Sequence, residues 1–310
     1  MKNPMISIVS PAYNEEENIP VFLKKLLPVL ENLHMPYEII FISDGSTDGT
    51  LDMMLKMKNK YADKEIRVLN FSRNFGKEAA ITAGLDKSRG DLIIPIDADL
   101  QHPPQLIEKF IDKWREGYDV VLAKRKNRFR EGYLKRTGAS FFYKIITKIS
   151  DITVPEDVGD YRLMTRKVVD AIKGLPENQR FMKGLFAWIG FKTATVEYDV
   201  RERHSGSTGF NIWKLWNLAI DGITSFSTWP LRIWTYIGMA ISSMSLVYAT
   251  FIIIKTLVFG VDTPGFASLM VGILMLGGIQ LIGIGILGEY IGRIYMESKR
   301  RPTYIIDREY

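Results

Sequence analysis

Two aspartates at the end of an apolar run are the residues of this chain best suited to chemistry. Asp97 and Asp99 follow Ile93-Ile94-Pro95-Ile96, and a loop with the prolines Pro103 and Pro104 comes after them. Side chains alternate along a strand, so both carboxylates are predicted to share a face at its carboxyl end. Adjacent carboxylates repel unless a cation or a proton separates them, and oxygen ligands suit Mg²⁺ or Mn²⁺. The pattern predicts a metal clamp for a diphosphate, with an aspartate-rich turn as the alternative.

The elements that must position these aspartates form an α/β pattern. Alternating apolar strands and amphipathic helices predict a doubly wound, mostly parallel sheet with helices on both faces. Such sheets bind ligands beyond the carboxyl ends of their strands. After residue 124 the pattern weakens into a basic segment, a loop and two helical stretches. The predicted strands are Ile6–Ser10, Tyr37–Ser43, Ile66–Phe71, Leu92–Asp97 and Asp119–Ala123, and the predicted helices are Asn18–Leu33, Thr47–Lys60, Lys77–Ser88 and Gln105–Glu116.

Two polar loops follow the first two predicted strands, where a ligand site is expected. The loops are Pro11–Asn18 and Ser43–Thr50, and Asp44 and Asp48 in the second can accept hydrogen bonds from ribose hydroxyls or base N–H groups. Ordinary turns and helix caps are the alternative for each loop. The sequence has no Gly-x-Gly-x-x-Gly after a strand and no Walker A motif, which disfavours hydride transfer and P-loop phosphoryl transfer.

Composition narrows the chemistry further. The 310 residues include no cysteine, so a disulfide framework, a thiolate metal site and a cysteine nucleophile are excluded. Three scattered histidines make a histidine zinc site improbable. The net charge of +6 favours anionic partners such as phosphates or a membrane surface.

Two stretches are long and apolar enough to cross a membrane. Residues 233–254 and 263–288 carry no charged side chain, and a bilayer core needs about 20 apolar residues in a helix. Two buried core helices are the alternative. Basic residues after the second stretch place the C-terminus in the cytoplasm, and two crossings return the N-terminal part to the same side. We therefore expect a multi-pass protein of the cytoplasmic (inner) membrane with both termini cytoplasmic.

A basic segment precedes the membrane region. Seven cations lie between Lys124 and Arg136, and the aromatic run Phe141-Phe142-Tyr143 follows. This composition suits an anionic membrane and a lipid phosphate, with a solvated basic face or a nucleic-acid patch as alternatives. The two apolar stretches make nucleic acid an improbable partner. We expect a catalytic domain at 1–210, an interfacial amphipathic helix at 211–230 (a core helix is the alternative), and at 231–310 two transmembrane helices, near 233–254 and 264–288, with a cytoplasmic tail.

A set of short motifs carries a family resemblance. They are Tyr13-Asn14-Glu15, Asp44–Asp48, Asn74–Lys77, Asp97–Gln101, Val158–Met164, Arg180–Leu185, Trp213–Asn217, Asp221–Ser227, Gly288–Arg293 and Arg301-Pro302. Together they resemble family 2 glycosyltransferases of the GT-A type, over nearly the whole chain. The closer likeness is to polyprenyl-phosphate glycosyltransferases, which include dolichol-phosphate mannose synthases, and within them to bacterial bactoprenol (undecaprenyl-phosphate) glucosyltransferases.

The resemblance implies roles for individual residues. Asp97 would lie near the ribose and diphosphate, and Asp99 with Gln101 would hold Mg²⁺ or Mn²⁺. Asp160 would lie at the sugar end as a base or positioning carboxylate. Relatives usually have a lysine at the position of Gly209, so a phosphate contact there is missing or comes from another residue. The donor nucleotide would be held by Pro11, Tyr13, Glu15, Asp44 and Asp97, and the acceptor phosphate by Arg125, Arg136 and Ser140.

The resemblance also implies the reaction. An inverting transferase would move glucose from UDP-glucose to undecaprenyl phosphate at the cytoplasmic face and give a β-linked product. Two alternatives stay open: the same reaction with UDP-N-acetylglucosamine or GDP-mannose, and a non-enzymatic membrane scaffold that binds nucleotide sugars. Expected partners are the UDP-sugar, the polyprenyl phosphate, membrane lipids, a homo-oligomeric copy and a flippase.

Overall fold

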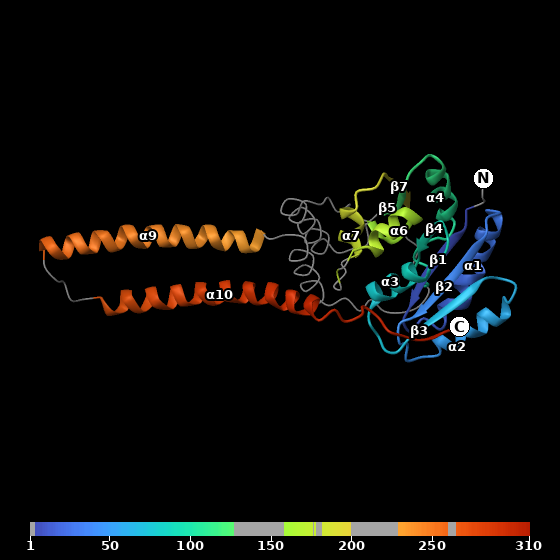
Figure 1. Ribbon diagram of the computed structural model, residues 1–310, viewed down its shortest axis with the longest axis horizontal. Helices are drawn as coiled ribbons and strands as arrows, with labels where there is room; N and C mark the ends of the chain where they lie inside the picture. The colour runs from blue at the N-terminus through green and yellow to red at the C-terminus, as the bar shows by residue number, and fades with distance from the viewer. Residues whose placement is uncertain (1–3, 127–157, 176, 178–181, 200–228, 260–264) are drawn as a thin grey trace.

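A mixed β-sheet lies in the compact part at one end of the protein, and a pair of long helices projects from that part (Figure 1). The computed structural model describes residues 4–126, 158–175, 177, 182–199, 229–259 and 265–310. Within these residues the sheet has eight strands in the order β7-β5-β6-β4-β1-β2-β3-β8. The strands are β1 (Ile6–Ala12), β2 (Tyr37–Ser43), β3 (Ile66–Phe71), β4 (Leu92–Pro95), β5 (Val120–Arg125), β6 (Val158–Thr165), β7 (Thr193–Tyr198) and β8 (Ile306–Glu309).

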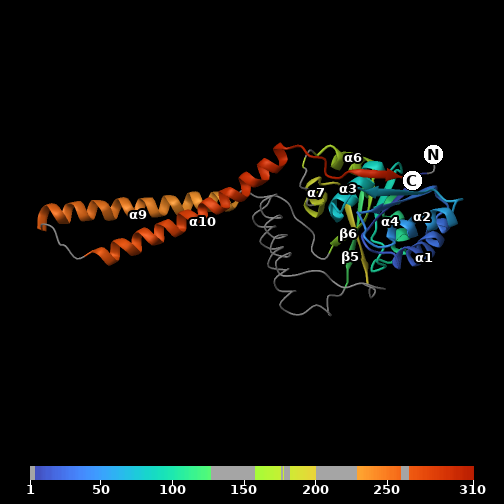
Figure 2. The ribbon, with the colours of Figure 1, turned by 90° about the horizontal axis from the view of Figure 1, so that it is seen from below.

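Helices cover both faces of this sheet, as the alternation of strands and helices predicts (Figure 2). Successive apolar residues of one strand supply the two cores: Ile39 packs on one face and Ile40 on the other. The first face carries α1 (Asn18–Asn32), α2 (Thr50–Lys60) and α4 (Leu106–Arg115). The second carries α3 (Lys77–Lys87), α6 (Arg166–Lys173) and α7 (Met182–Trp188). Both faces of the central strands are therefore buried, which explains why they read as continuous apolar runs.

The sheet departs from the mostly parallel arrangement outside its centre. The strands β3, β2, β1 and β4 are parallel, as predicted. However, β6 runs antiparallel between β4 and β5, and β8 runs antiparallel along β3. The sequence pattern missed β6, β7 and β8. Strand β8 offers only one partly buried residue among four, and β7 alternates weakly, so neither has a clear apolar period.

Two long apolar helices, α9 (Trp229–Phe259) and α10 (Phe266–Ser298), form the projection (Figure 1). They touch where Gly283 lies against the ring of Trp234. In the described part of the chain, Met275–Ser298 is long and apolar enough to span a membrane. A second span stays a prediction. Residues 211–228 of the predicted interfacial helix lie outside the described residues, and residues 229 and 230 begin α9.

The chain returns to the sheet after α10. Strand β8 pairs with β3, and Tyr310 and Val68 exchange backbone hydrogen bonds of 2.9 and 3.1 Å. The final residues, expected only as a tail, thus complete one edge of the sheet. The N-terminal domain is joined to the helix pair at both ends of that pair.

Candidate active site

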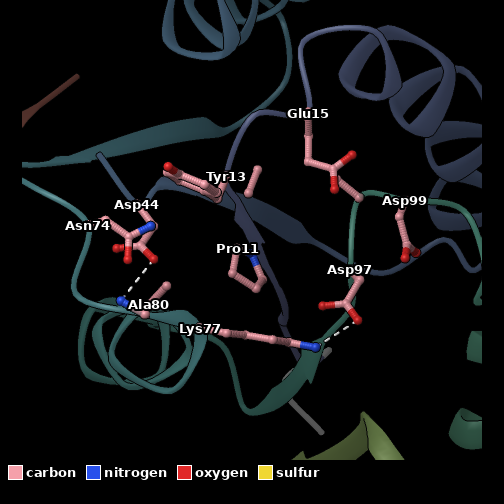
Figure 3. Close-up of a pocket in the computed structure, with 12 residues that line it drawn as sticks. Pro11, Tyr13, Glu15, Asp44, Asn74, Lys77, Ala80, Asp97 and Asp99 are labelled. Carbon is pink, nitrogen blue, oxygen red and sulfur yellow. Dashed lines mark hydrogen bonds and ion pairs between the residues drawn. The ribbon is translucent and has the colours of Figure 1, made fainter. Parts of the chain in front are cut away.

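A cavity of about 290 Å³ opens beside the ends of β1, β2 and β4 and the first turn of α3 (Figure 3). This position matches the ligand site expected for an open α/β sheet. All five residues predicted to hold the nucleotide line the cavity, together with Asp99. The lining residues are Pro11, Ala12, Tyr13, Glu15, Asp44, Asn74, Gly76, Lys77, Ala80, Asp97, Ala98 and Asp99.

Asp97 and Asp99 line this cavity from a turn, whereas the sequence pattern predicted that they end a strand. Strand β4 ends at Pro95, although the N–H of Ile96 still donates to the carbonyl oxygen of Val9 on β1 at 2.9 Å, and Asp97 and Asp99 lie in the turn beyond it rather than on one strand face. Leu100 follows with φ of 63°, a left-handed conformation that bends the chain sharply. The backbone N–H of Gln101 donates to Asp99 Oδ1 at 3.1 Å. The side chain of Gln101 is not among those that line the cavity.

Side-chain hydrogen bonds tie the two predicted site loops together. Asn14 adopts φ of 55°, and its Oδ1 accepts the backbone N–H of Thr47 at 2.9 Å. The backbone N–H of Glu15 donates to Thr50 Oγ1 at 2.8 Å. These contacts present Tyr13, whose side chain is 45% exposed, at the mouth of the cavity. An exposed aromatic ring in this place can stack against a nucleobase.

Asp44 has a second task beside lining the cavity. Its buried carboxylate accepts the backbone N–H of Phe75 at 2.7 Å and that of Gly76 at 3.0 Å. Burial raises the pKa of Asp44, and these two hydrogen bonds act in the opposite direction. Gly76 has φ of 97°, which favours glycine. Asp44 therefore fixes the turn that starts α3.

Lys77 bridges two carboxylates that are far apart in sequence. Its Nζ lies 2.8 Å from Asp97 Oδ2 and 2.9 Å from Asp160 Oδ2. Desolvation acts to lower the pKa of Lys77, but the two carboxylates outweigh it and the pKa is raised. The sequence showed Lys77 only as part of a motif and gave it no role. The sequence did contain a feature that could have identified it. Lys77 follows a glycine and begins a predicted helix at the edge of the sheet where the ligand site is expected.

Asp160 comes to the site on β6, the antiparallel strand that the sequence pattern missed. Arg162, two residues further on, is buried beneath the ring of Phe186 at 3.8 Å and donates to the carbonyl oxygen of Gly159 at 2.7 Å. Burial lowers the pKa of Arg162 to about 10, which leaves it charged at neutral pH. Arg162 thereby fixes the backbone next to Asp160, and Lys77 binds the carboxylate of Asp160.

A buried polar chain leads from Asp97 toward the predicted acceptor side. His102 Nε2 lies 3.7 Å from Asp97 Oδ2, and its Nδ1 lies 2.8 Å from the hydroxyl of Tyr198. Burial lowers the pKa of His102, while Asp97 acts to raise it. Burial raises the pKa of Tyr198, and a hydrogen bond from Arg125 acts to lower it. Arg125 is thus connected to the cavity, whereas Arg136 and Ser140 lie outside the described residues.

The donor set fits a divalent cation completed by a phosphate ligand. Within the described ranges, no group of three or more histidine, cysteine, aspartate or glutamate side chains forms a complete metal site. However, Asp97 and Asp99 supply two carboxylates at the cavity, and Mg²⁺ characteristically takes one or two carboxylates and fills its shell with water and substrate phosphates. The lining holds four acidic side chains and, in the part of the chain that the structure describes, one basic side chain. An anionic ligand therefore requires an added cation there.

Comparison with known proteins agrees with this architecture. Residues 7–173 match the family described as Glycosyl transferase family 2, and residues 229–294 match the GtrB C-terminal hairpin. A glucosyl-3-phosphoglycerate synthase of Mycobacterium tuberculosis, solved with Mn²⁺, UDP and phosphoglyceric acid, has a TM-score of 0.50 at 18% identity, over 71% of this chain and 76% of that one. At this identity the likeness shows the shared GT-A-like fold alone.

Full-length relatives are much more similar. The bactoprenol glucosyl transferase of Shigella phage SfV is 54% identical over 304 residues, which is 98% of each chain. The prophage bactoprenol glucosyl transferase homolog of Escherichia coli K12 is 53% identical over 303 residues, again 98% of each. The chain therefore belongs to glycosyl transferase family 2, and it is a glycosyltransferase. The resemblance found in the sequence motifs is confirmed.

Proposed function

We propose that this enzyme transfers glucose from UDP-glucose to undecaprenyl phosphate at the cytoplasmic face of the membrane. The carrying observation is the cavity in which the Asp97–Asp99 turn, Tyr13 and Lys77 meet. The relatives named as bactoprenol glucosyl transferases support both the sugar and the lipid, because they match over nearly the full chain.

The nucleotide of the donor would lie along the ends of β1 and β2. Tyr13 would contact the base, and Glu15 and Asp44 would accept its N–H groups or the ribose hydroxyls. Asp99 and Asp97 would hold Mg²⁺ or Mn²⁺, and the side chain of Gln101, which does not line the cavity, would have to turn toward the cation to join them. When bound, this cation would supply Lewis-acid stabilisation of the negative charge on the departing diphosphate. Arg125, Arg136 and Ser140 would receive the acceptor phosphate.

The chemistry needs little help in removing a proton. The second pKa of a phosphate monoester is about 6, so the lipid phosphate is largely a dianion at neutral pH. One of its oxygens attacks the anomeric carbon, the bond from that carbon to the diphosphate breaks, and UDP leaves with the electron pair. A single displacement inverts the centre and gives a β-linked product. We therefore assign Asp160 to orientation of the reacting groups, in agreement with its fixed position between Arg162 and Lys77.

The pairing of β8 with β3 bears on the membrane topology. Strand β3 precedes the helix pair and β8 follows it, yet the two strands are neighbours in one sheet. A single crossing between them would place them on opposite sides of the membrane. If Met275–Ser298 crosses, a second crossing earlier in the chain is needed, and we assign it to α9, which gives a two-span hairpin with the catalytic domain and C-terminus on one side.

A donor panel tests this function. Membranes containing the protein are supplied with undecaprenyl phosphate, Mg²⁺ and labelled UDP-glucose, UDP-N-acetylglucosamine or GDP-mannose. We expect lipid labelling from UDP-glucose that disappears with EDTA. Labelling from another donor would change the sugar while leaving the reaction class intact. Absence of both labelling and nucleotide binding would contradict the enzyme proposal.

A further inference from the structure

Lys77 stands at a place in the fold where a cation is unfavourable for the helix itself. It is the first residue of α3, and the partial positive charge of a helix N-terminus favours acidic side chains there. Helix stability therefore does not explain this lysine. Its side chain extends along the cavity floor toward Asp97 rather than away into solvent (Figure 3).

The charge of the cavity gives Lys77 a specific task. Four carboxylates line the cavity, and among the described residues Lys77 supplies its only cationic side chain. A diphosphate entering this space meets strong repulsion unless positive charge faces it. A divalent cation can neutralise part of the negative charge that causes this repulsion. Among the described lining residues, the protein's own positive charge comes from Lys77.

The geometry leaves the ammonium group able to take a ligand. An ammonium has three N–H donors, and the described structure gives it two partners, Asp97 at 2.8 Å and Asp160 at 2.9 Å. The side chain is 45% exposed, so the remaining donor is accessible from the cavity.

We propose that Lys77 binds the diphosphate of the nucleotide donor while it holds Asp160 against Asp97. The inference rests on the proposed function, because it assigns the donor's diphosphate to this cavity. One ammonium group then links the donor's leaving group to the carboxylate that orients the sugar. A change at Lys77 therefore affects the recognition of phosphate more than that of the nucleoside.

Binding of UDP and of uridine to the purified full-length protein, with Mg²⁺ and without acceptor, tests this inference. A charge-assisted hydrogen bond corresponds to roughly tenfold or more in affinity, so we expect Lys77→Met to weaken UDP binding by about that factor. Uridine has no phosphate, and its binding should stay unchanged. Lys77→Arg keeps the charge and should recover most of the UDP affinity.

A matched control is Lys87→Met, at the opposite end of the same helix and similarly exposed, which should bind UDP like the wild type. Equal UDP affinity in Lys77→Met and the wild type would overturn the inference. Equal losses for UDP and uridine would also overturn it, because they indicate a structural role. GDP is tested with the wild type as a second nucleotide. If the wild type binds neither UDP nor GDP, the proposed function is contradicted, and this inference is contradicted with it.

Discussion

The ring of Tyr304 stacks on the ring of Phe71, with centroids 5.3 Å apart and planes within 8° of parallel. Phe71 in turn meets Phe75 edge to face at 5.7 Å. Phe75 belongs to the turn that Asp44 fixes at the cavity. The segment that returns from the helix pair is thus packed behind the loop that carries Asn74 and Lys77.

We expect Tyr304→Ala to destabilise the catalytic domain by about 1–3 kcal/mol, because it removes a partly buried aromatic stack. It also removes the 2.9 Å hydrogen bond from the Tyr304 hydroxyl to Asp86. Tyr304→Phe keeps the stack and should lose only about 1 kcal/mol. Denaturant unfolding of the purified protein measures both. Arg308→Ala, an exposed change on β8, is the control, and equal stability of all three variants would contradict the packing role.

Low pH should reduce the stability that the C-terminal strand β8 gains from the ion pair of Glu309. The hydrogen bond from Arg67 lowers the pKa of Glu309 below its usual value of 4.5, and Lys87 adds to the effect, while Arg67 also pairs with buried Glu38. A lowered folded-state pKa means that the pairing stabilises the fold above pH 4.5 and is lost as the pH falls through the folded value. Because Glu309 is partly exposed, we expect less than about 1 kcal/mol. Glu309→Gln should be less stable than the wild type at pH 7, and the difference should shrink as the pH is lowered below 4.5. A difference that does not change with pH would argue against the ion pair.

Asp99→Asn should lower transfer by about 10²–10³-fold, because it removes a charged ligand from the proposed cation site. The asparagine can still accept the hydrogen bond from Gln101, so the turn should keep its shape. Initial rates of lipid labelling over a range of Mg²⁺ or Mn²⁺ concentrations provide the measurement. Asp112→Asn, at an exposed position on α4, serves as the control. Unchanged transfer in Asp99→Asn would remove this residue from the site.

The anomeric configuration of the product distinguishes one displacement from two. We expect a β-linked lipid phosphate from the α-linked donor, because the dianionic acceptor can attack directly. Proton–proton coupling at the anomeric position of the released sugar phosphate reports the configuration. A product that keeps the α configuration would require a covalent intermediate or a front-face route, and would contradict the role assigned to Asp160.

The absence of native cysteine makes the topology directly testable. Single cysteines are introduced as Asp262→Cys, between α9 and α10 in sequence, and Asp307→Cys, at an exposed position on β8. In intact spheroplasts, an impermeant maleimide should label the first and spare the second. After permeabilisation both should react. Labelling of both sites from the same side before permeabilisation would exclude the two-span hairpin.

The central sheet and much of the cavity follow from local patterns in the sequence. The predicted strand Ile66–Phe71 has the bounds of β3, and four of its six residues are apolar and buried. Loops after β1 and β2 were predicted to meet at a ligand site, and Tyr13 and Asp44 do line one cavity. These features depend on periods of a few residues, which a single sequence reveals.

Long-range pairings could not be predicted in the same way. Strand β8 has four largely exposed residues, and it is a strand only because β3 offers an open edge. The bridge from Lys77 to Asp160 depends on β6 inserting antiparallel between β4 and β5. Each of these depends on a partner far away in the sequence.

The most direct test of the account is transfer by the purified protein from labelled UDP-glucose, with undecaprenyl phosphate present or omitted and with Mg²⁺ or EDTA. We expect labelled lipid only when the acceptor and the metal are both present. Labelled lipid that forms equally well in EDTA would contradict the metal site at Asp99. If no lipid is labelled although UDP-glucose binds, transfer to undecaprenyl phosphate would be ruled out as the reaction of this enzyme.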